Sequence, residues 1–176
     1  MKLFYSIIFF SIFIISSSFK SIEREPTVNW ITWDEAVALQ KVKPKKVMVD
    51  IYTKWCGWCK KMDSSTFLQP NVVNYINTNF YAVKFDAESD KQIIFDNHLF
   101  QIMTEGNSKV HELAYSLLDG KMTYPSIVYL NENWNRILIS PGFKDEGMIL
   151  KELKYLGDDI YLKQTWPNYD ASYMKN

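Results

Sequence analysis

The 176-residue sequence contains only two cysteines, Cys56 and Cys59, and they are three positions apart. A small domain that depended on disulfides for its stability would carry more of them. The two thiols are too few for a structural disulfide framework, so their presence needs a chemical explanation of its own.

The sequence also has no excess of charge of either sign. It contains 20 Lys and Arg residues and 20 Asp and Glu residues, which gives a formal net charge of zero. The lysines at positions 41, 43, 45 and 46 are best interpreted as a solvated turn before a strand. No basic stripe of the kind that binds nucleic acid is present, and we expect no nucleic-acid partner.

Histidine is equally scarce, with only His98 and His111 in the chain. A zinc site on the two cysteines would need both histidines, and their spacings match no common zinc pattern. No Ser or Cys nucleophile is evident as a partner for either ring. We therefore predict that both histidines are surface residues and that the protein has no metal site.

One long apolar run stands at the N-terminus. Lys2 precedes the nearly continuous apolar residues 3–15, and three serines follow at 16–18. This pattern is typical of a secretory signal peptide, and the run is marginal for a membrane span, which needs about 20 apolar residues. We expect residues 1–18 to be an export signal. A membrane contact is expected only in the alternative case, in which the signal stays uncleaved as an anchor.

The rest of the sequence alternates between helical and strand patterns. Helices are expected at residues 33–41, 56–64, 71–77, 107–118 and 145–156, with a short one near Trp166, and strands at 47–53, 80–86, 126–130 and 136–140. Thr32 and Glu35 fit a capping box at the first helix, and residues 93–102 favour a β-hairpin. This order predicts an α/β fold with helices on both faces of a mixed sheet.

The two cysteines lie where a buried strand passes into a helix. On a first helical turn, residues three apart are close enough to form a disulfide. The sulfur of Cys56 would face free N–H groups and the positive end of the helix dipole, which stabilise the nucleophilic thiolate. Lys54 and Lys60 add positive potential, and Cys59 is placed to attack a mixed disulfide formed by Cys56. A redox pair is the favoured interpretation; a static disulfide and two unrelated buried thiols are the alternatives.

The segment VMVDIYTKWCGWCK, residues 47–60, resembles the active-site segment of the thioredoxin-like superfamily, and the element order is similar over residues 30–157. The resemblance implies a thioredoxin fold, a mixed central sheet flanked by helices. Compared with a minimal thioredoxin, the chain has an inserted segment at about 89–120 and a C-terminal extension at 158–176. Residues 19–29 would form a linker to the domain.

The resemblance also implies roles for a carboxylate and a lysine. Asp50, six residues before Cys56, matches a buried acid that assists proton transfer at the second cysteine, Cys59. A desolvated carboxylate has a raised pKa and can serve as a base. Lys84 matches the lysine that pairs with this acid. The alternatives are an Asp satisfied by backbone N–H groups at a strand edge and a lysine that faces solvent.

A substrate-binding edge is implied at two further places. Tyr124-Pro125 matches a cis-proline that faces the redox pair and presents backbone to an extended substrate segment. Gly142 matches a glycine beside the substrate groove. A trans-proline at a strand start and a simple Pro141-Gly142 turn are the alternatives. The expected substrate-binding residues are Trp55, Gly57, Trp58, Tyr124, Pro125 and Gly142.

The chain departs from the usual pattern at Trp58, which replaces the proline found between the cysteines, so the direction of electron flow stays open. The segment is similar to an exported bacterial subgroup that includes the periplasmic thioredoxin-like domain of transmembrane disulfide reductases. This similarity implies a periplasmic protein with no cofactor beyond the Cys56–Cys59 disulfide. Its partners would be protein thiols or disulfides and an upstream electron donor such as a membrane disulfide reductase.

The favoured function is that of an enzyme, a thiol–disulfide oxidoreductase acting on proteins, with the reductase direction preferred. One rival is a non-catalytic binding module or chaperone-like adaptor that uses residues 89–120 and the aromatic tail as its contact surface. Another is a Cu(I) carrier with two thiolate ligands. The aromatic residues Trp134, Trp166 and Tyr173 are interpreted as packing residues.

Overall fold

The structure is a computed structural model that describes residues 26–106 and 108–173. The predicted signal peptide at residues 1–18 lies outside these residues. Among the helices of the described part, none has the length and apolar character needed to cross a membrane.

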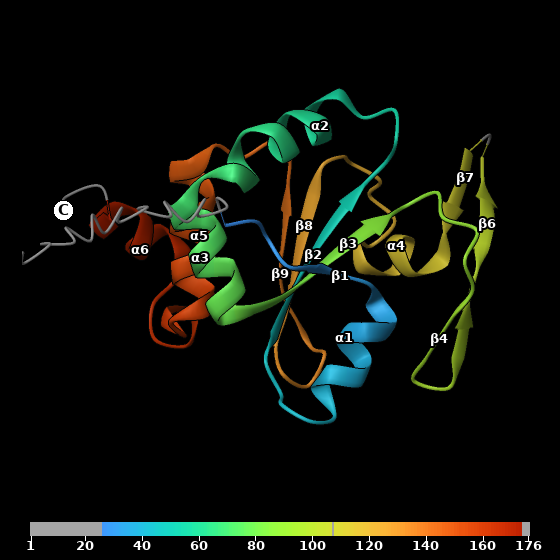
Figure 1. The fold of residues 1–176 in the computed structure, drawn as a ribbon, viewed down its shortest axis with the longest axis horizontal. Coiled ribbons are helices and arrows are strands. Elements are labelled where there is room, and N and C mark those ends of the chain that lie inside the picture. Colours follow the sequence, from blue (N-terminus) through green and yellow to red (C-terminus); the bar gives the residue numbers. More distant parts are fainter. Residues whose placement is uncertain (1–25, 107, 174–176) are drawn as a thin grey trace, which may run out of the picture.

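A five-stranded mixed sheet lies at the centre of the molecule, with the strand order β1-β3-β2-β8-β9 (Figure 1). The strands are β1 Trp30–Ile31, β2 Lys46–Tyr52, β3 Phe80–Asp86, β8 Ser126–Leu130 and β9 Arg136–Pro141. β1 and β2 each pair with β3 in parallel, whereas β8 runs antiparallel to both β2 and β9. This sheet confirms the predicted fold class.

Helices cover both faces of the sheet, and each face has its own buried core (Figure 1). The helices are α1 Trp33–Gln40, α2 Gly57–Ser64, α3 Pro70–Asn79, α4 Glu112–Leu117 and α5 Glu146–Gly157, and a 3-10 turn, η1, follows α2 at Thr66–Leu68. α3 and α5 bury Ile76 and Leu153 on one face, and α1 and α4 bury Ala36 and Leu113 on the other. The capping box of Thr32 and Glu35 at the start of α1 is present, as predicted.

The side chains of β2 alternate between these two cores. Val47, Val49 and Ile51 belong to the core under α1 and α4, and Met48 belongs to the core under α3 and α5. Because the side-chain period of a strand is two, Asp50 points to the same face as Met48. The strand therefore carries a carboxyl group into the core just before the two cysteines.

The segment between β3 and β8 contains two hairpins on the side of the molecule away from α5 (Figure 1). The first, β4 Ile93–Phe95 and β5 His98–Phe100, confirms the predicted hairpin. Its turn residues Asp96 and Asn97 both have positive φ, 50° and 60°, as a tight two-residue hairpin turn requires. The second, β6 Ile102–Glu105 and β7 Ser108–His111, was not expected from the sequence.

The second hairpin corrects two predictions. The helix predicted over residues 107–118 is wrong in its first part, because residues 108–111 pair with β6 and only Glu112–Leu117 is helical. The prediction that His111 lies on the surface is also wrong, since the residue is fully buried. Its Nδ1 accepts the Leu113 N–H at 3.1 Å, and its Nε2 lies 2.9 Å from the Lys91 carbonyl oxygen. The ring is therefore the N-cap of α4, held inside by backbone partners.

The C-terminal segment packs against α5 through aromatic rings. It contains the 3-10 turn η2 Ile160–Leu162 and α6 Trp166–Tyr173, which confirms the short helix expected near Trp166. The Tyr155 ring on α5 lies 5.1 Å from the rings of both Trp166 and Tyr169. The Trp134 ring lies 5.0 Å from the Trp33 ring. These tryptophans are packing residues, as predicted.

Residues just before β1, which the sequence interpretation assigned to a linker, contact α3. Val28 is buried in the core under α3 and α5. The side chain of Asn77 accepts the Asn29 N–H at 2.9 Å and donates to the Thr27 carbonyl oxygen at 2.9 Å. The chain is thus tied to the domain from Thr27 onwards.

Candidate active site

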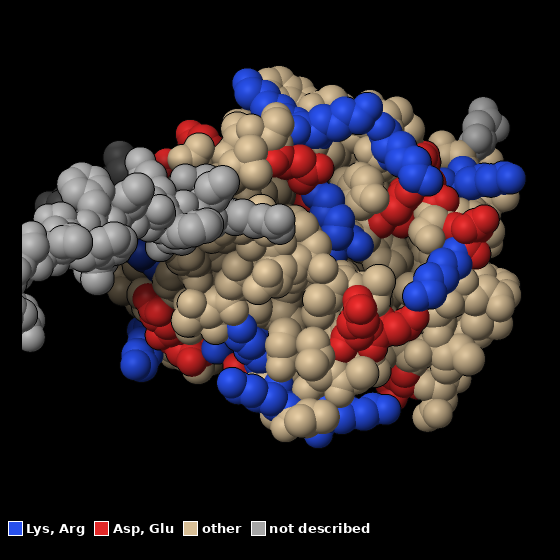
Figure 2. All heavy atoms as spheres, viewed as in Figure 1, with Lys and Arg blue, Asp and Glu red and all other residues tan. Residues whose placement is uncertain are grey.

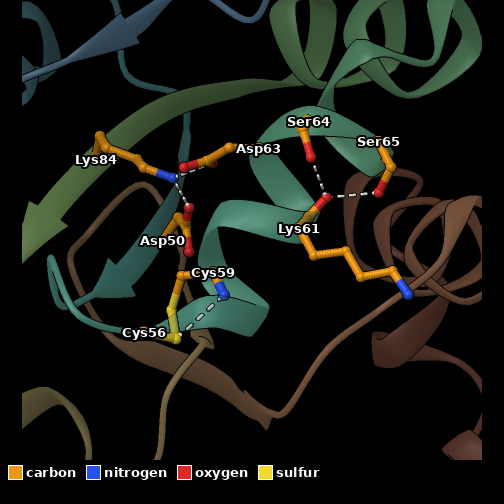
Figure 3. Close-up of polar contacts among 8 residues, drawn as sticks. All are labelled: Asp50, Cys56, Cys59, Lys61, Asp63, Ser64, Ser65 and Lys84. Atoms are coloured by element: carbon orange, nitrogen blue, oxygen red, sulfur yellow. Dashed lines mark hydrogen bonds and ion pairs between the residues drawn. A yellow bond between two sulfur atoms is a disulfide. The ribbon is translucent and has the colours of Figure 1, made fainter.

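The two cysteines are joined by a disulfide at the start of α2 (Figure 3). β2 ends at Tyr52, and the Cys56 N–H donates to the Thr53 carbonyl oxygen at 3.1 Å as the chain turns into the helix. Cys56 is the N-cap residue of α2, and its Sγ accepts the Cys59 N–H at 3.1 Å. The fold thus brings the pair predicted from the sequence together, with 5.3 Å between the Cα atoms.

The sulfur of Cys56 lies where a negative charge is stabilised. The first turn of a helix has N–H groups without helical partners, and its end carries the positive side of the helix dipole. One of these groups, the Cys59 N–H, already points at Cys56 Sγ. In the reduced protein the same contact stabilises a Cys56 thiolate, which is the nucleophilic form of the residue.

Further inside the protein than the disulfide, the Lys84 ammonium bridges the carboxylates of the buried Asp50 and of Asp63 (Figure 3). Asp50 lies opposite Lys84 in the parallel pairing of β2 and β3, so the two side chains are in contact, as the resemblance implied. Asp63 comes from α2, and sequence reasoning missed it. Its position four residues after Cys59, one helical turn along the same face, is the signal that could have found it.

The Asp50 carboxyl is fully buried between Lys84 and Cys59 (Figure 3). Burial raises its pKa, and the Lys84 ammonium only partly offsets this rise. Burial alone would lower the pKa of Lys84, but the carboxylates of Asp50 and Asp63 outweigh it and raise that pKa. Asp50 Oδ1 has no hydrogen-bond partner among the described residues. The site therefore holds a buried carboxyl group that can take up a proton beside the second cysteine.

The turn before β8 lies beside the cysteine segment. The Tyr124–Pro125 peptide bond is cis, the form that the resemblance implied. The Tyr124 ring meets the Trp55 ring edge to face at 5.9 Å, and the Trp55 Nε1–H donates to Glu88 at 2.9 Å. Burial, with the nearby charges of Glu88 and Asp86, raises the pKa of Tyr124 to about 12. Tyr124 is therefore a neutral ring in the wall of the site.

The turn after β9 contacts both the cis-proline and the segment between the cysteines. Gly142, with φ of 87°, donates its N–H to the Pro125 carbonyl oxygen at 2.8 Å. The Phe143 ring lies 5.3 Å from the Trp58 ring, and the Lys61 ammonium stands over both rings at 5.4 and 5.0 Å. The sequence interpretation named Gly142 and Trp58 but missed Phe143, whose role depends on this distant contact.

The surface around the disulfide is both apolar and basic. Trp55 and Trp58 are 66% and 57% exposed, and no heavy atom would contact a Cβ placed on Gly57. Basic side chains form a band over the end of the molecule that carries α2, where Lys60 and Lys61 are exposed (Figure 2). Nearby positive charge favours a thiolate over a thiol. The rings of Trp55 and Trp58, the residues just before Cys56 and Cys59, are therefore exposed apolar surface.

The other candidate ligands lie away from this site. The His98 side chain is 63% exposed and its Nε2 lies 3.8 Å from Glu112, which confirms its prediction as a surface residue. In residues 26–106 and 108–173, no three His, Cys, Asp or Glu side chains are grouped as metal ligands would be. The sequence has two cysteines, Cys56 and Cys59, so a metal site with thiolate ligands would have to use them.

The sheet, the Cys-x-x-Cys disulfide at the start of α2 and the cis-proline before β8 together define a thioredoxin-fold protein. Similar solved structures share this fold. A thioredoxin-fold protein from Helicobacter pylori is 15% identical, with a TM-score of 0.56 over 81% of this chain and 83% of that chain. A thioredoxin from Thermus thermophilus is 20% identical, with a TM-score of 0.55 over 74% and 87%. A structure described as DsbH oxidoreductase is 15% identical, with a TM-score of 0.52 over 75% and 85%.

The chain belongs to the family described as Thioredox_DsbH, protein of unknown function, DUF255. The model of this family matches residues 13–140, which is more than half of the chain. No curated protein matches the sequence. Family membership and the structural likeness establish a thioredoxin-like protein with a Cys56–Cys59 pair.

Proposed function

We propose that the protein is a thiol–disulfide oxidoreductase that exchanges its Cys56–Cys59 disulfide with thiols and disulfides of other proteins. The observation that carries this proposal is the disulfide at the N-terminus of α2, above the buried pair of Asp50 and Lys84. The N-terminus of α2 stabilises a Cys56 thiolate, and the buried carboxyl group of Asp50 is a proton acceptor next to the Cys59 thiol. A static disulfide would need neither of them.

In the reductase direction the reaction begins with the reduced protein. The Cys56 thiolate attacks one sulfur of a substrate disulfide, forms a mixed disulfide and releases the other substrate sulfur as a thiolate, which takes up a proton. Asp50 accepts the proton of Cys59. The Cys59 thiolate then attacks Cys56 Sγ, the mixed disulfide breaks, and the second substrate sulfur leaves as a thiolate and is protonated. Two electrons have passed to the substrate, and the Cys56–Cys59 disulfide has formed.

The same residues serve the reverse reaction, in which substrate thiols are oxidised. We favour the reductase direction because residues 47–60 resemble the reducing branch of the superfamily. We propose periplasmic export on the pattern of residues 1–18, with an electron donor such as a membrane disulfide reductase to return the pair to the dithiol form.

The substitution Cys56→Ala tests this function against the non-catalytic binding module. The exposed side chain of Ile94, 75% accessible in the first hairpin, is the observation that favours such a module. We expect the variant to lose all measurable reduction of a protein disulfide, because the attacking sulfur is absent. The measurement is the rate at which a disulfide-bonded protein is reduced with dithiothreitol as the electron source, followed by quenching, alkylation and mass analysis, after the rate with dithiothreitol alone has been subtracted. Cellular or binding activity that survives in the variant would favour the module instead.

A further inference from the structure

A second buried carboxylate lies in the core under α5. The Glu152 side chain on α5 is buried, and the Ser140 hydroxyl on β9 donates to its Oε1 at 2.7 Å. Among the described residues, Glu152 Oε2 and the Tyr129 hydroxyl on β8 have no hydrogen-bond partner. Its helix neighbours Ile149 and Leu153 are fully buried apolar residues. A carboxylate in such a place is costly unless it is hydrogen-bonded or paired with a cation.

The cation that faces Glu152 belongs to the turn after β9. The Lys144 ammonium lies 4.0 Å from Glu152 Oε1, and its side chain is only 12% exposed. The same ammonium donates to the carbonyl oxygens of Pro141 at 2.7 Å and Gly142 at 3.2 Å. The Thr66 hydroxyl donates to the Lys144 carbonyl oxygen at 2.6 Å and ties the turn to η1. The turn is thus closed around a partly buried cation, and Glu152 is its counter-charge.

This turn also contacts the cis-proline and the tryptophan between the two cysteines. Gly142 binds the Pro125 carbonyl oxygen, and Phe143 packs on Trp58. We call Pro125, Gly142 and Phe143 the docking edge. Because the turn holds two of these three residues, any shift of the turn moves the docking edge relative to Cys56.

On the basis of the oxidoreductase function proposed above, we propose that Glu152 is a positioning residue that holds the docking edge, through Lys144, in the form that accepts an extended protein segment. The carboxylate neutralises Lys144, which in turn holds the carbonyl groups of the turn. Small disulfides need only access to the sulfur of Cys56. Loss of Glu152 should therefore impair reactions with protein substrates, which need the docking edge, and spare reactions with small thiols and disulfides.

The charge state of Glu152 provides a second readout. The groups that face it are Ser140 on β9, Tyr129 on β8, Lys144 in the turn and Lys151 on its own helix. Burial raises the pKa of Glu152, although the hydrogen bond from Ser140 and the charge of Lys144 act in the opposite direction. Protonation at mildly acidic pH removes the counter-charge of Lys144, so the affinity for a protein substrate should fall as the pH is lowered.

The test is the substitution Glu152→Gln in the full chain, with Glu132→Gln, at the opposite end of β8, as the matched control. For a disulfide-bonded protein substrate we expect KM to rise about tenfold, the equivalent of one weakened charged contact, with little change in kcat. The rate with glutathione disulfide should equal that of the wild type. The acid-side rise in KM should be present in the wild type and absent in Glu152→Gln. Thermal stability should fall only a little, because the lost counter-charge of Lys144 is offset by removal of a costly buried carboxylate, and the Lys144 ammonium keeps its two carbonyl contacts.

Lys144→Met is the second variant, and it should reproduce the rise in KM. An unchanged KM for the protein substrate in Glu152→Gln and Lys144→Met would overturn the inference, as would equal losses with protein and small disulfides. A wild-type protein that reduces neither substrate would instead overturn the proposed oxidoreductase function. The two failures are therefore distinguishable in the same assay.

Discussion

Replacing Cys59 with serine is expected to trap the protein in mixed disulfides with its substrates. Cys56 at the N-terminus of α2 keeps the N–H contact that stabilises its thiolate, so the first attack on a substrate still occurs. The second attack cannot follow, because a serine hydroxyl does not displace a thiolate. Turnover should be lost, and covalent adducts should accumulate on a non-reducing gel, each dissociated by dithiothreitol.

Cys56→Ser is the control for this experiment, and it should give neither turnover nor adducts. Intact-mass measurement and peptide mapping would place the linkage at Cys56 in the Cys59→Ser protein. Adducts formed through Cys59 in the Cys56→Ser protein, at the same yield, would reverse the order of attack. Turnover in either variant would contradict the mechanism.

Asp50→Asn is expected to slow the resolution of the mixed disulfide by roughly 100-fold, the lower end of the usual contribution of a general base. Asparagine has a similar shape but cannot accept the Cys59 proton. Lys84 keeps an ionic partner in Asp63, so the variant does not leave an unpaired cation. The measurement is single-turnover reduction of a protein disulfide, followed by quenching and alkylation so that the mixed disulfide is resolved from the product.

The same substitution should raise stability at neutral pH by about 1 kcal/mol, because it removes a carboxylate whose burial is only partly compensated. The pKa of Asp50 is raised in the folded protein, so between the ordinary pKa of Asp and this raised pKa the folded state holds a proton that the unfolded chain has lost. Stability therefore falls as the pH rises from the ordinary pKa of Asp through the folded pKa. Asp50→Asn should remove this dependence.

Asp34→Asn, which removes an exposed carboxylate paired with Lys91, is the control for both effects. Urea unfolding across the acid range would show the change in pH dependence. If Asp50→Asn resolved mixed disulfides as fast as the wild type, Asp50 would not be the proton acceptor. A loss of stability at neutral pH would mean that the ion pair with Lys84 outweighs the cost of burial.

The parts of the site that are local in sequence could be predicted from it. Cys56 and Cys59 follow a strand and open a helix, so one helical turn is enough to bring them together. The carboxyl group of Asp50 is placed in the core by the two-residue period of β2. The contact of Asp50 with Lys84 and the cis form of Tyr124–Pro125 were implied by the resemblance to thioredoxins. From residue types alone, Asp50 and Lys84 could equally be surface charges, and Tyr124-Pro125 could be an ordinary turn.

The parts that depend on tertiary packing were missed. Val110 continues the helical spacing of Leu113 and Leu117, but pairing with β6 makes residues 108–111 a strand and buries His111. Asp63 joins the site only because α2 lies over β3, and Phe143 joins it only because the turn after β9 meets Trp58. In the sequence Glu152 looks like an ordinary helical carboxylate, and only the fold places it 4.0 Å from the Lys144 ammonium. Each of these roles is set by packing between elements that the residue types alone do not reveal.

The most direct test of the account is the redox equilibrium of the Cys56–Cys59 pair. The protein would be equilibrated with graded glutathione buffers, quenched with acid and alkylated, and the fraction of dithiol measured by mass. The account predicts a reversible two-electron couple, and the reductase direction predicts a potential near the reducing end of the thioredoxin scale, about −270 mV. A potential near about −120 mV would reverse the direction of electron flow. A pair that stays fully oxidised or fully reduced across all buffers would contradict the central claim that Cys56 and Cys59 exchange electrons with other proteins.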